Sequence, residues 1–346
     1  MRARPDIPAR TPTGEGRRLA ETGAIAPDSV RQDLARYLVV GASGFVGQHV
    51  WEHLKSLGLE VVGTQAHARK PELVTFDILQ HKLANCVDRS FFEREGQVFV
   101  ILCAAVSDMD RCLQDRELSH RVNVEQTIQV INEAYTLGAR PVFISTGFVF
   151  DGTVGYYTED APLSPVNEYG RFKAEVEVYL RSRFPETFVV RLDKTVCDRP
   201  HPQNLFSEWY ERLLLDKPII CIQGQLFSVT SMNDIARAIV LGCQRGLTGL
   251  FHVANSEYFY RDELARQFCY AAGKLPNVIC RPLGEFNFVD NRALKSYLDG
   301  SKFVKATGFR FVSMRQVMQE FLRNVQREKY SRPEQPPRAG KESGCP

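Results

Sequence analysis

The sequence predicts an α/β fold built around a doubly wound parallel sheet. Short β-rich apolar runs alternate with amphipathic stretches from residue 36 to residue 191. The first run ends at a glycine-rich turn, Gly41-Ala-Ser-Gly44-Phe-Val-Gly47, that opens a helix. The chain has 346 residues, 44% of them hydrophobic and 25% charged, which suffices for one large α/β domain or two modest ones. Strands that alternate with helices imply parallel βαβ units.

The elements follow from the apolar pattern in chain order. Six strands are expected, over residues 36–40, 60–64, 73–76, 98–102, 141–145 and 187–191. Helices are expected over residues 48–57, which Gly58 closes as a C-cap signal, over 119–137, and around Tyr169. Beyond residue 191 the alternation loosens to helices over 205–215, 232–242 and 261–272 and a strand over 249–253. A first domain over 36–195 and a smaller α/β domain over 196–325 are therefore expected to interleave.

Both ends of the chain read as disordered. Residues 1–35 are polar and rich in Arg, Pro and Gly, without the apolar segment that a secretory signal needs. An Arg-rich start also suits an organelle transit peptide, but Glu15, Glu21 and Asp28 interrupt the positive charge and favour a disordered extension. Residues 326–346 read as a disordered tail. We expect a cytoplasmic protein.

Composition argues against several classes of protein. A net charge of +3 without a concentrated Lys/Arg stripe gives no argument for nucleic acid as a partner. No apolar run approaches the ~20 residues that span a bilayer, so no membrane partner is expected. Nine cysteines without a C-x-x-C pair read as reduced thiols, and neither they nor the histidines show metal-ligand spacing. We allow for a homodimer.

The glycine-rich turn predicts a dinucleotide site. Gly41, Gly44 and Gly47 follow a strand and open a helix, the context in which this spacing lets the backbone approach a pyrophosphate. Ser43, Phe45 and Val46 complete the predicted contact segment. A glycine-rich turn without a ligand is the less favoured interpretation.

The end of the second strand favours NADP(H) over NAD(H). An NAD site usually has an acid there for the ribose hydroxyls, whereas Thr64-Gln-Ala-His-Ala-Arg69-Lys70 contains none. Arg69 and Lys70 would bind the 2′-phosphate, although they would also suit a solvated loop. Asp77 and Ile78, after the third strand, are candidates to hold the adenine.

Tyr169 and Lys173 are the candidate proton-transfer pair. They are four residues apart, so on a helix they share one face. A tyrosine pKa of ~10 must fall by ~3 units, or ~4 kcal/mol, for acid or base work near neutrality. An ammonium ~4 Å away at an effective dielectric of ~20 supplies about that energy. Thr146 could donate a hydrogen bond to the same substrate oxygen.

Together these residues resemble the extended short-chain dehydrogenase/reductase superfamily, and within it the dTDP-4-dehydrorhamnose reductase-like subgroup. The resemblance runs from about residue 36 to residue 322. The motifs that carry it are Gly41-x-x-Gly44-x-x-Gly47, Cys103-Ala-Ala105, Arg121-Val-Asn-Val124, Ser145-Thr-Gly-Phe-Val-Phe-Asp-Gly152, Tyr157-Thr-Glu-Asp160, Pro165-Val-Asn-Glu-Tyr169, Lys173, and Ser296-Tyr-Leu-Asp299 with Arg292. It implies a Rossmann-type sheet with a smaller substrate-binding domain, and a nucleotide sugar as substrate.

The resemblance assigns roles residue by residue. Tyr169 would be the proton donor, Lys173 would bind the nicotinamide ribose and lower the tyrosine pKa, and Thr146 would polarise a 4-keto oxygen. Asn123 would support the local backbone and a water chain, and Cys103, Ala104 and Ala105 would line the dinucleotide. Asp108, Phe148 and Arg292 are candidate substrate contacts, with a solvated loop as the simpler interpretation of Asp108.

Three departures from the subgroup bear on the sugar and on the stereochemical outcome, and the second of them lies near the expected nicotinamide. Gly147 and Phe148 replace the usual Asp-Tyr and so remove a carboxylate and a phenol beside the reacting centre. Leu192-Asp-Lys194 replaces a less charged segment, and Ala293 stands where the subgroup has proline.

Three functions are compatible with this pattern. The leading hypothesis is NADPH-dependent reduction of a 4-keto-6-deoxy nucleotide sugar. A nucleotide-sugar epimerase or dehydratase is a second hypothesis, which the missing acid after the second strand disfavours. The third is a non-catalytic, NADP-binding regulatory subunit, because the β subunit of methionine adenosyltransferase is similar to this subgroup.

Overall fold

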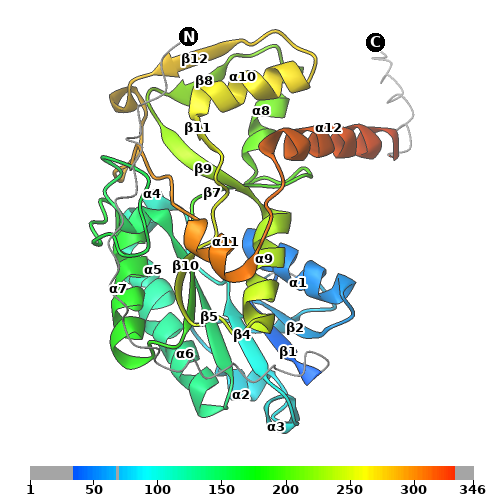
Figure 1. Ribbon diagram of the computed structural model, residues 1–346, viewed down its shortest axis with the longest axis vertical. Coiled ribbons are helices and arrows are strands. Elements are labelled where there is room, and N and C mark those ends of the chain that lie inside the picture. The colour runs from blue at the N-terminus through cyan, green and yellow to red at the C-terminus, as the bar shows by residue number, and fades with distance from the viewer. Residues whose placement is uncertain (1–33, 68–69, 332–346) are drawn as a thin grey trace, which may run out of the picture.

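A seven-stranded parallel sheet forms the larger part of the molecule. The computed structural model describes residues 34–67 and 70–331 (Figure 1). In spatial order the strands are β10 (Gly249–His252), β6 (Phe188–Leu192), β5 (Arg140–Thr146), β4 (Val98–Leu102), β1 (Arg36–Val40), β2 (Glu60–Gln65) and β3 (Val74–Thr75). Every pairing between them is parallel, so the doubly wound sheet predicted from the sequence is confirmed.

Helices bury both faces of this sheet. One face carries α1 (Phe45–Ser56), α9 (Met232–Gln244) and α11 (Ser301–Thr307). The other carries α4 (Met109–Gln114), α5 (Arg116–His120), α6 (Thr127–Thr136), α7 (Glu168–Arg183) and the short helices α2 (Leu83–Cys86) and α3 (Ser90–Glu93). In β1, Tyr37 and Val39 pack on the first face and Leu38 and Val40 on the second. Burial on both faces explains why the strands are continuous apolar runs.

The smaller part lies beyond the carboxyl ends of the large sheet, at the top of Figure 1. It contains a three-stranded sheet of β11 (Tyr258–Tyr260), β9 (Leu226–Ser231) and β7 (Lys194–Val196), and a pair of strands, β12 (Val278–Arg281) and β8 (Ile219–Ile222). Its helices are α8 (Leu205–Leu214), α10 (Arg261–Ala271) and α12 (Met314–Ser331), with 3₁₀ turns η3 (Gly147–Val149) in the loop after β5 and η4 (Leu283–Glu285) after β12. An aromatic core of Phe206, Trp209, Phe268 and Phe321 holds it together.

The two parts interleave along the chain, as expected. The chain leaves the large sheet at β6 and enters the smaller part at β7. It returns with α9 and β10, which belong to the core of the large sheet, before it forms β11 and α10. The boundary at residues 195 and 196 therefore stays a prediction, since no single point in the chain separates the two cores.

One predicted helix, over residues 119–137, has three segments. Between α5 and α6 lies a π-helical turn, η2 (Arg121–Gln126). The Thr127 hydroxyl donates to the Val122 carbonyl five residues earlier, at 2.9 Å, which satisfies an acceptor that the wider turn leaves open. The turn carries Asn123, and π turns of this kind are frequent at functional sites.

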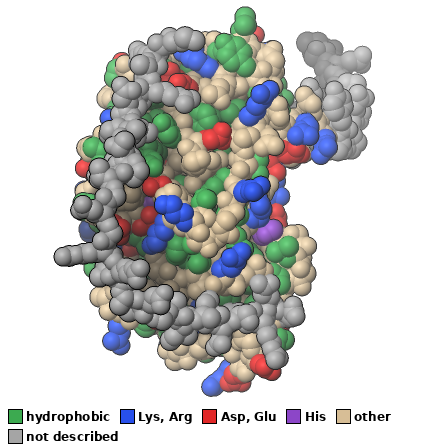
Figure 2. Space-filling model, viewed as in Figure 1, with side chains coloured by type: hydrophobic (Ala, Val, Ile, Leu, Met, Phe, Trp, Pro, Cys, Tyr) green, Lys and Arg blue, Asp and Glu red, His purple; other side chains and the backbone are tan. Residues whose placement is uncertain are grey.

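Side chains of both charges cover the surface. In the face shown in Figure 2, Lys and Arg side chains are dispersed among apolar and acidic ones. No helix among residues 34–67 and 70–331 is long and apolar enough to cross a membrane. Residues 1–33 and 332–346, which include most of both expected tails, lie outside the described ranges.

Candidate functional site

The glycine turn packs more tightly than any side chain would allow. Gly41 has a φ of 85°, and a Cβ there would lie 2.7 Å from the backbone nitrogen of Ala104. A Cβ on Gly47 would lie 2.2 Å from the carbonyl oxygen of Gly41. Gly44 is the N-cap of α1 and provides no side-chain cap, so amide groups of the first turn remain available to an anion. The geometry suits the pyrophosphate expected from the sequence, with Ser43, Phe45 and Val46 partly exposed along the same turn.

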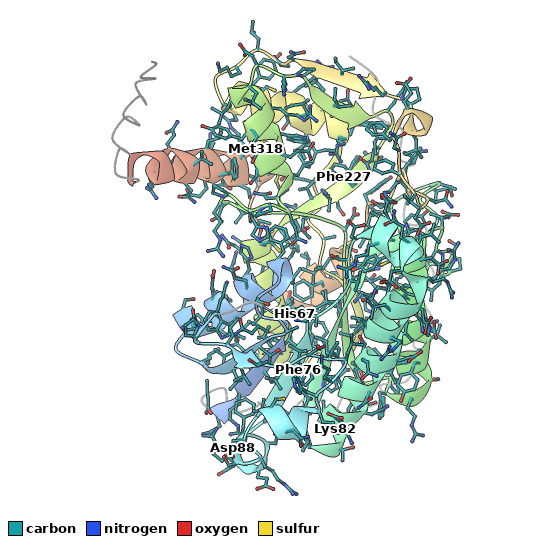
Figure 3. The ribbon with its side chains drawn as sticks, turned by 180° about the vertical axis from the view of Figure 1, so that it is seen from behind. His67, Phe76, Lys82, Asp88, Phe227 and Met318 are labelled. Carbon is teal, nitrogen blue, oxygen red and sulfur yellow. The ribbon has the colours of Figure 1, made fainter. Side chains whose placement is uncertain are left out.

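The loop after β2 is organised by a glutamine. The side chain of Gln65 accepts from the Lys70 amide at 2.9 Å and donates to the Lys70 carbonyl at 2.9 Å. This clamp holds Lys70 beside the end of β2. Figure 3 labels His67, which follows the same strand. Arg69, the other predicted cation, lies outside the described residues.

Asp77 is engaged within its own turn. Its carboxylate accepts from the Leu79 amide at 2.9 Å and from the Gln80 side chain at 2.8 Å. Asp77 and Ile78 are both buried. Their role in holding an adenine stays a prediction, with the carboxylate oxygens already in use.

The segment after β4 is held by Asn123. Its side-chain oxygen accepts from the Val106 amide at 2.9 Å, and its side-chain nitrogen donates to the Val106 carbonyl at 2.9 Å. The contact supports the backbone that follows Cys103, Ala104 and Ala105, all of which are partly exposed at the carboxyl edge of the sheet. Asn123 itself is fully buried, so any effect on a dinucleotide is transmitted through this backbone and not by direct contact.

Tyr169 and Lys173 lie on one face of α7, beside the end of β5. The Lys173 ammonium donates to the Ile144 carbonyl at 2.8 Å and lies 5.8 Å from the centre of the Tyr169 ring. Thr146 is the last residue of β5, and its side-chain oxygen accepts from the Phe148 amide at 3.2 Å. The Tyr169 hydroxyl has no hydrogen-bond partner in the part of the chain that the structure describes. All three predicted catalytic side chains therefore gather at one edge of the sheet.

The pKa of Tyr169 differs from the expectation. Burial raises the pKa of the phenol above its usual value, with a smaller contribution from the Cys112 thiol. Burial also lowers the pKa of Lys173 to about 8. The predicted lowering of the tyrosine pKa is absent because the ammonium is hydrogen-bonded to a backbone carbonyl and not to the phenol. The phenol therefore holds its proton at neutral pH.

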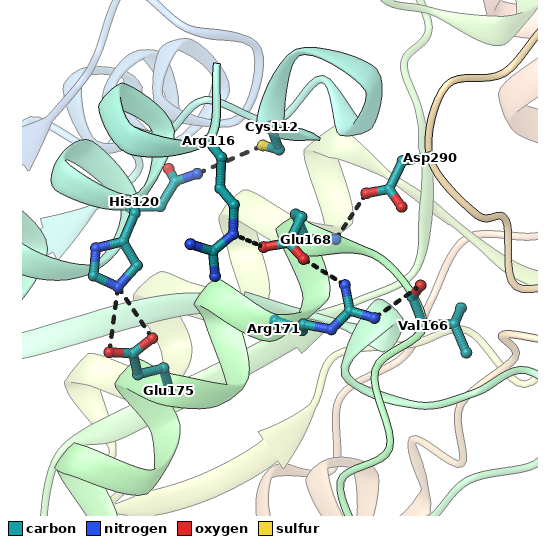
Figure 4. Close-up of polar contacts among 9 residues, drawn as sticks. Cys112, Arg116, His120, Val166, Glu168, Arg171, Glu175 and Asp290 are labelled. Carbon is teal, nitrogen blue, oxygen red and sulfur yellow. Dashed lines mark hydrogen bonds and ion pairs between the residues drawn. The ribbon is translucent and has the colours of Figure 1, made fainter. Parts of the chain in front are cut away.

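The first turn of α7, which carries Tyr169, is held by a helix cap and by the contacts of Glu168, which Figure 4 shows. Asn167 caps the helix by accepting from the Gly170 amide at 2.8 Å. The Glu168 carboxylate pairs with Arg116 at 2.8 Å and with Arg171 at 2.6 Å, and the Glu168 amide donates to Asp290 at 2.7 Å. These contacts hold the helix turn that carries the tyrosine.

A buried ion pair between Glu177 and Arg191 supports the same site. Glu177, one turn after Lys173, accepts from Arg191 at 2.9 and 2.5 Å and from the Ser145 hydroxyl at 2.5 Å. Both charged side chains are almost completely buried. The Arg191 guanidinium also contacts His252 at 3.2 Å, and burial and this cation lower the histidine pKa to about 3. The imidazole is therefore neutral.

The three predicted substrate contacts have different environments. Asp108 is exposed and caps α4 by accepting from the Arg111 amide at 2.9 Å. Phe148 is partly exposed in η3, directly beside Thr146. The Arg292 side chain is 10% exposed, pairs with Asp110 at 2.9 Å and lies over the Phe288 ring. Their contact with a substrate stays a prediction, and Arg292 would have to release Asp110 to make it.

Sequence reasoning did not recognise a polar cluster beside Gly147. The Asp193 carboxylate accepts from Ser296 at 2.7 Å and from the amide and hydroxyl of Ser228 at 2.8 and 2.9 Å. A Cβ on Gly147 would lie 3.6 Å from this carboxylate and 3.2 Å from the Ser296 carbonyl. Burial raises the pKa of Asp193 to about 7, against the effect of its hydrogen bonds. The departures at Gly147 and Asp193, which the sequence shows separately, therefore occur at one place.

His201 is a second residue that the sequence did not single out for the site. Its ring stacks on Phe45 in the glycine turn, with centroids 4.4 Å apart. Arg199 pairs with Glu52 of α1. Burial lowers the pKa of His201, and nearby His49, Arg199 and Lys70 add to the effect. No local signal could have found this contact, since about 150 residues separate the two rings.

Comparison with known proteins places the chain in a family. A family model described as RmlD substrate binding domain matches residues 35–327. The chain is 28% identical over 246 residues to the probable low-salt glycan biosynthesis reductase Agl14 of Haloferax volcanii, a match that covers 68% of this chain and 79% of the relative. It is 30% identical over 245 residues to methionine adenosyltransferase 2 subunit beta of Danio rerio, covering 68% of this chain and 74% of that protein.

A solved structure shows the same fold. The dTDP-4-dehydrorhamnose reductase of Clostridium acetobutylicum superposes with a TM-score of 0.72 at 24% identity, covering 84% of this chain and 99% of that one. At this identity the likeness supports the fold, and the match to the family model identifies the family. The chain therefore belongs to the RmlD substrate binding domain family, and with it to the extended short-chain dehydrogenase/reductase superfamily of NAD(P)-dependent oxidoreductases.

Proposed function

We propose that this chain is an NADPH-dependent reductase of a 4-keto-6-deoxy nucleotide sugar, with Tyr169 as the proton donor. The observation that carries the proposal is the convergence of Thr146, Tyr169 and Lys173 at the end of β5, beside the glycine cradle. A cytoplasmic location and a homodimer are consistent with it, and gel filtration with light scattering tests the latter.

The bound dinucleotide would supply the hydride. The chain itself would orient the substrate carbonyl and provide the proton. Thr146 would donate a hydrogen bond from its hydroxyl to the keto oxygen. The hydroxyl hydrogen can turn toward the substrate while the hydroxyl oxygen still accepts from the Phe148 amide. Tyr169 keeps its proton at neutral pH because burial raises its pKa, the state that a proton donor to a developing alkoxide needs. Lys173, held by the Ile144 carbonyl, would meet the nicotinamide ribose.

The preference for NADPH rests on Lys70. Gln65 holds the loop, and no carboxylate ends β2 to bind a 2′-hydroxyl. We expect Lys70→Met to weaken NADPH binding roughly tenfold while NADH binding changes less than twofold. Fluorescence titration of both dinucleotides tests this, and Lys82→Met, in the loop before α2, is the matched control. Equal losses for the two dinucleotides would contradict the preference.

The test of the reaction is NADPH oxidation with 4-keto-6-deoxy sugars linked to dTDP or UDP. We expect Tyr169→Phe to lower kcat by roughly 100- to 10,000-fold, because the proton donor is lost, with little change in NADPH affinity. Tyr179→Phe is the matched control, since this phenol lies on the same helix and donates to Asn132. Wild-type turnover in the Tyr169→Phe variant would show that another group supplies the proton.

A regulatory subunit is the second candidate function. It is favoured by the identity of 30% to methionine adenosyltransferase 2 subunit beta and by the loss of a carboxylate and a phenol at Gly147 and Phe148. Co-purification with a methionine adenosyltransferase catalytic subunit, together with no turnover on keto sugars, would favour this function. An epimerase or dehydratase would instead retain NAD on purification.

A further inference from the structure

The segment that follows β7 joins the smaller part to the helix that the glycine cradle opens. This segment, residues 197–204, lies against α1, where Arg199 pairs with Glu52 at 2.5 Å. The buried Asn204 side chain donates to the carbonyl oxygens of Cys197 and Arg199, at 2.9 and 3.1 Å. The segment is therefore a turn that its own hydrogen bonds hold closed, and an ion pair fastens it to α1.

His201, within this turn, lies on the first residue of α1. Its ring is stacked on the Phe45 ring, with centroids 4.4 Å apart and planes at 19°. The His49 ring packs against the same phenyl ring at 87°, and its Nδ1 donates to the Phe45 carbonyl at 2.8 Å. Two imidazoles thus hold the Phe45 side chain, and one of them is supplied by the smaller part.

The hydrogen bonds of His201 determine which of its ring nitrogens can donate. The Gln203 amide donates to Nδ1 at 3.1 Å, and an amide can donate only to a ring nitrogen that carries no hydrogen. The hydrogen of the imidazole is therefore on Nε2. Within residues 34–67 and 70–331, this Nε2 has no hydrogen-bond partner, and the side chain is partly exposed. His201 thus offers one N–H donor that no described residue uses.

The cradle beside this imidazole is the expected place of the dinucleotide. The chain belongs to a family of NAD(P)-dependent oxidoreductases, and neither Gly41 nor Gly47 leaves room for a Cβ. The Gln48 amide donates to the Gly44 carbonyl at 2.9 Å, so the amides of residues 45–47 come before the first bond within the helix. These amides are open to a pyrophosphate. The first of them belongs to the residue on which the His201 ring is stacked.

We propose that His201 binds the dinucleotide, and that its Nε2–H donates to a phosphate oxygen of the pyrophosphate. The inference rests on the proposed dinucleotide site, but it does not depend on which sugar is reduced. A hydrogen bond to an anionic oxygen is stronger than one to a neutral acceptor. The closed turn and the stack on Phe45 hold the ring before binding, which lowers the entropic cost of the contact. The smaller part thereby contributes to cofactor binding, and the cofactor fastens the two parts together.

Two substitutions separate the donor from the ring. His201→Phe keeps the stack on Phe45 and removes the donor, whereas His201→Gln removes the ring and keeps an N–H group at about the position of Nε2. Fluorescence titration of the full-length protein with NADPH and with NADH measures the affinities. His201→Phe should bind both dinucleotides roughly 10- to 100-fold more weakly, because both contain the pyrophosphate. His201→Gln should lose roughly threefold or less, because a donor remains.

A control and a second measurement accompany the titration. His53→Phe, the same substitution two turns further along α1, should bind both dinucleotides like wild type. Thermal melting verifies that each variant is folded. In hydrogen exchange, NADPH should slow the amides of residues 197–204 in wild type and in His201→Gln, and it should leave them unchanged in His201→Phe. A role in packing alone would not produce this difference.

The outcomes separate this contact from the proposed reaction. Weaker binding of both dinucleotides by His201→Phe, with His201→Gln and the control near wild type, supports the contact whether or not any keto sugar is reduced. Wild-type affinity in His201→Phe overturns the contact and leaves the reductase in place. A loss in His201→Gln as large as that in His201→Phe, or larger, would assign the effect to the ring and overturn the hydrogen bond. A loss for NADPH alone would overturn the assignment to the pyrophosphate. If wild type binds neither dinucleotide, the contact and the proposed cofactor are both overturned.

Discussion

The two sides of the candidate site are built in different ways. On the dinucleotide side, Gly41 to Gly47 form the cradle within one turn, and Tyr169 and Lys173 share one helix face. On the substrate side, the polar groups around Gly147 come from widely separated segments, represented by Asp193, Ser228 and Ser296. The first side relies on backbone geometry and local spacing. The second relies on side-chain charges and hydrogen bonds brought together by the fold.

The difference indicates where specificity can change. A backbone cradle tolerates almost no side chain at Gly41 or Gly47, so its sequence is constrained by contact distances. The Asp193 cluster is made of side chains from three separated segments, so we expect single substitutions there to leave the large sheet in place. We therefore expect changes on the dinucleotide side to affect the whole molecule or the cofactor, and changes on the substrate side to have smaller, local effects.

The largest effect is expected at the buried ion pair between Glu177 and Arg191, next to the dinucleotide side. Glu177→Gln should lower the free energy of unfolding by about 3–5 kcal/mol, because it leaves the Arg191 guanidinium buried without a counter-charge. Urea denaturation measures the change. Glu175→Gln on the same helix is the matched control, since its carboxylate is 55% exposed and faces His120. Equal losses of stability in the two variants would show that the buried Glu177 carboxylate stabilises the protein no more than the exposed Glu175 carboxylate does.

The glycine cradle is the next most sensitive element. Gly47→Ala should weaken NADPH binding roughly 100-fold, about 2.7 kcal/mol, because its Cβ would overlap the Gly41 carbonyl. Fluorescence titration with NADPH provides the measurement. Gly284→Ala, where a Cβ meets no atom within 4 Å, should bind like wild type. Normal binding by Gly47→Ala would show that the turn can open without cost.

Asp193 should make the substrate side sensitive to pH. Its pKa is raised to about 7 in the folded protein, so the folded state binds more protons than the unfolded state, and stability falls as pH rises from about 4 to 7. Asp193→Asn should remove about 2 kcal/mol of this decline, as chemical denaturation at several pH values would show. Asp160→Asn, exposed in the loop before α7, is the control. If the free energy of unfolding changed with pH in the same way in wild type and in Asp193→Asn, the raised pKa of the Asp193 carboxyl would be contradicted.

The smallest effect is expected where the loop before residue 293 meets α4. The Asp110 carboxylate pairs with Arg292 and accepts from the amides of Val289 and Asp290 at 2.9 Å. Asp110→Asn should cost about 1 kcal/mol, because the ion pair is partly exposed and the amide acceptor remains. Hydrogen exchange at the Val289 and Asp290 amides should accelerate. Asp108→Asn should leave these amides unchanged, because Asp108 caps α4 instead.

Prediction from the sequence succeeded where neighbours in the chain are neighbours in space. The order of the six strands and the helix that carries Tyr169 follow from apolar periodicity. The π-helical turn at Arg121–Gln126 was not predicted, because the residues on both sides of it are helical and the stretch was read as one continuous helix. The strands of the smaller sheets, β7, β8, β9, β11 and β12, were not predicted, because the alternation of apolar runs with amphipathic stretches loosens beyond residue 191.

The electrostatics of the site were the least predictable part. Spacing placed Lys173 beside Tyr169, but the ammonium donates to Ile144 and burial raises the tyrosine pKa. A pKa depends on depth and on every neighbouring charge, neither of which a linear spacing contains. The stacking of His201 on Phe45 is likewise a contact between residues far apart in the chain.

By itself the sequence determined the doubly wound sheet, the glycine cradle and the helix face shared by Tyr169 and Lys173. These depend on φ preferences, apolar period and covalent spacing, which are local properties of a chain. Only the tertiary structure decided that Asp193 lies beside Gly147, that Arg292 is held by Asp110, and that His201 stacks on Phe45. Those contacts depend on how the smaller part packs against the edge of the large sheet. Burial at that edge then determines the pKa values, and so the charge states, of the side chains there.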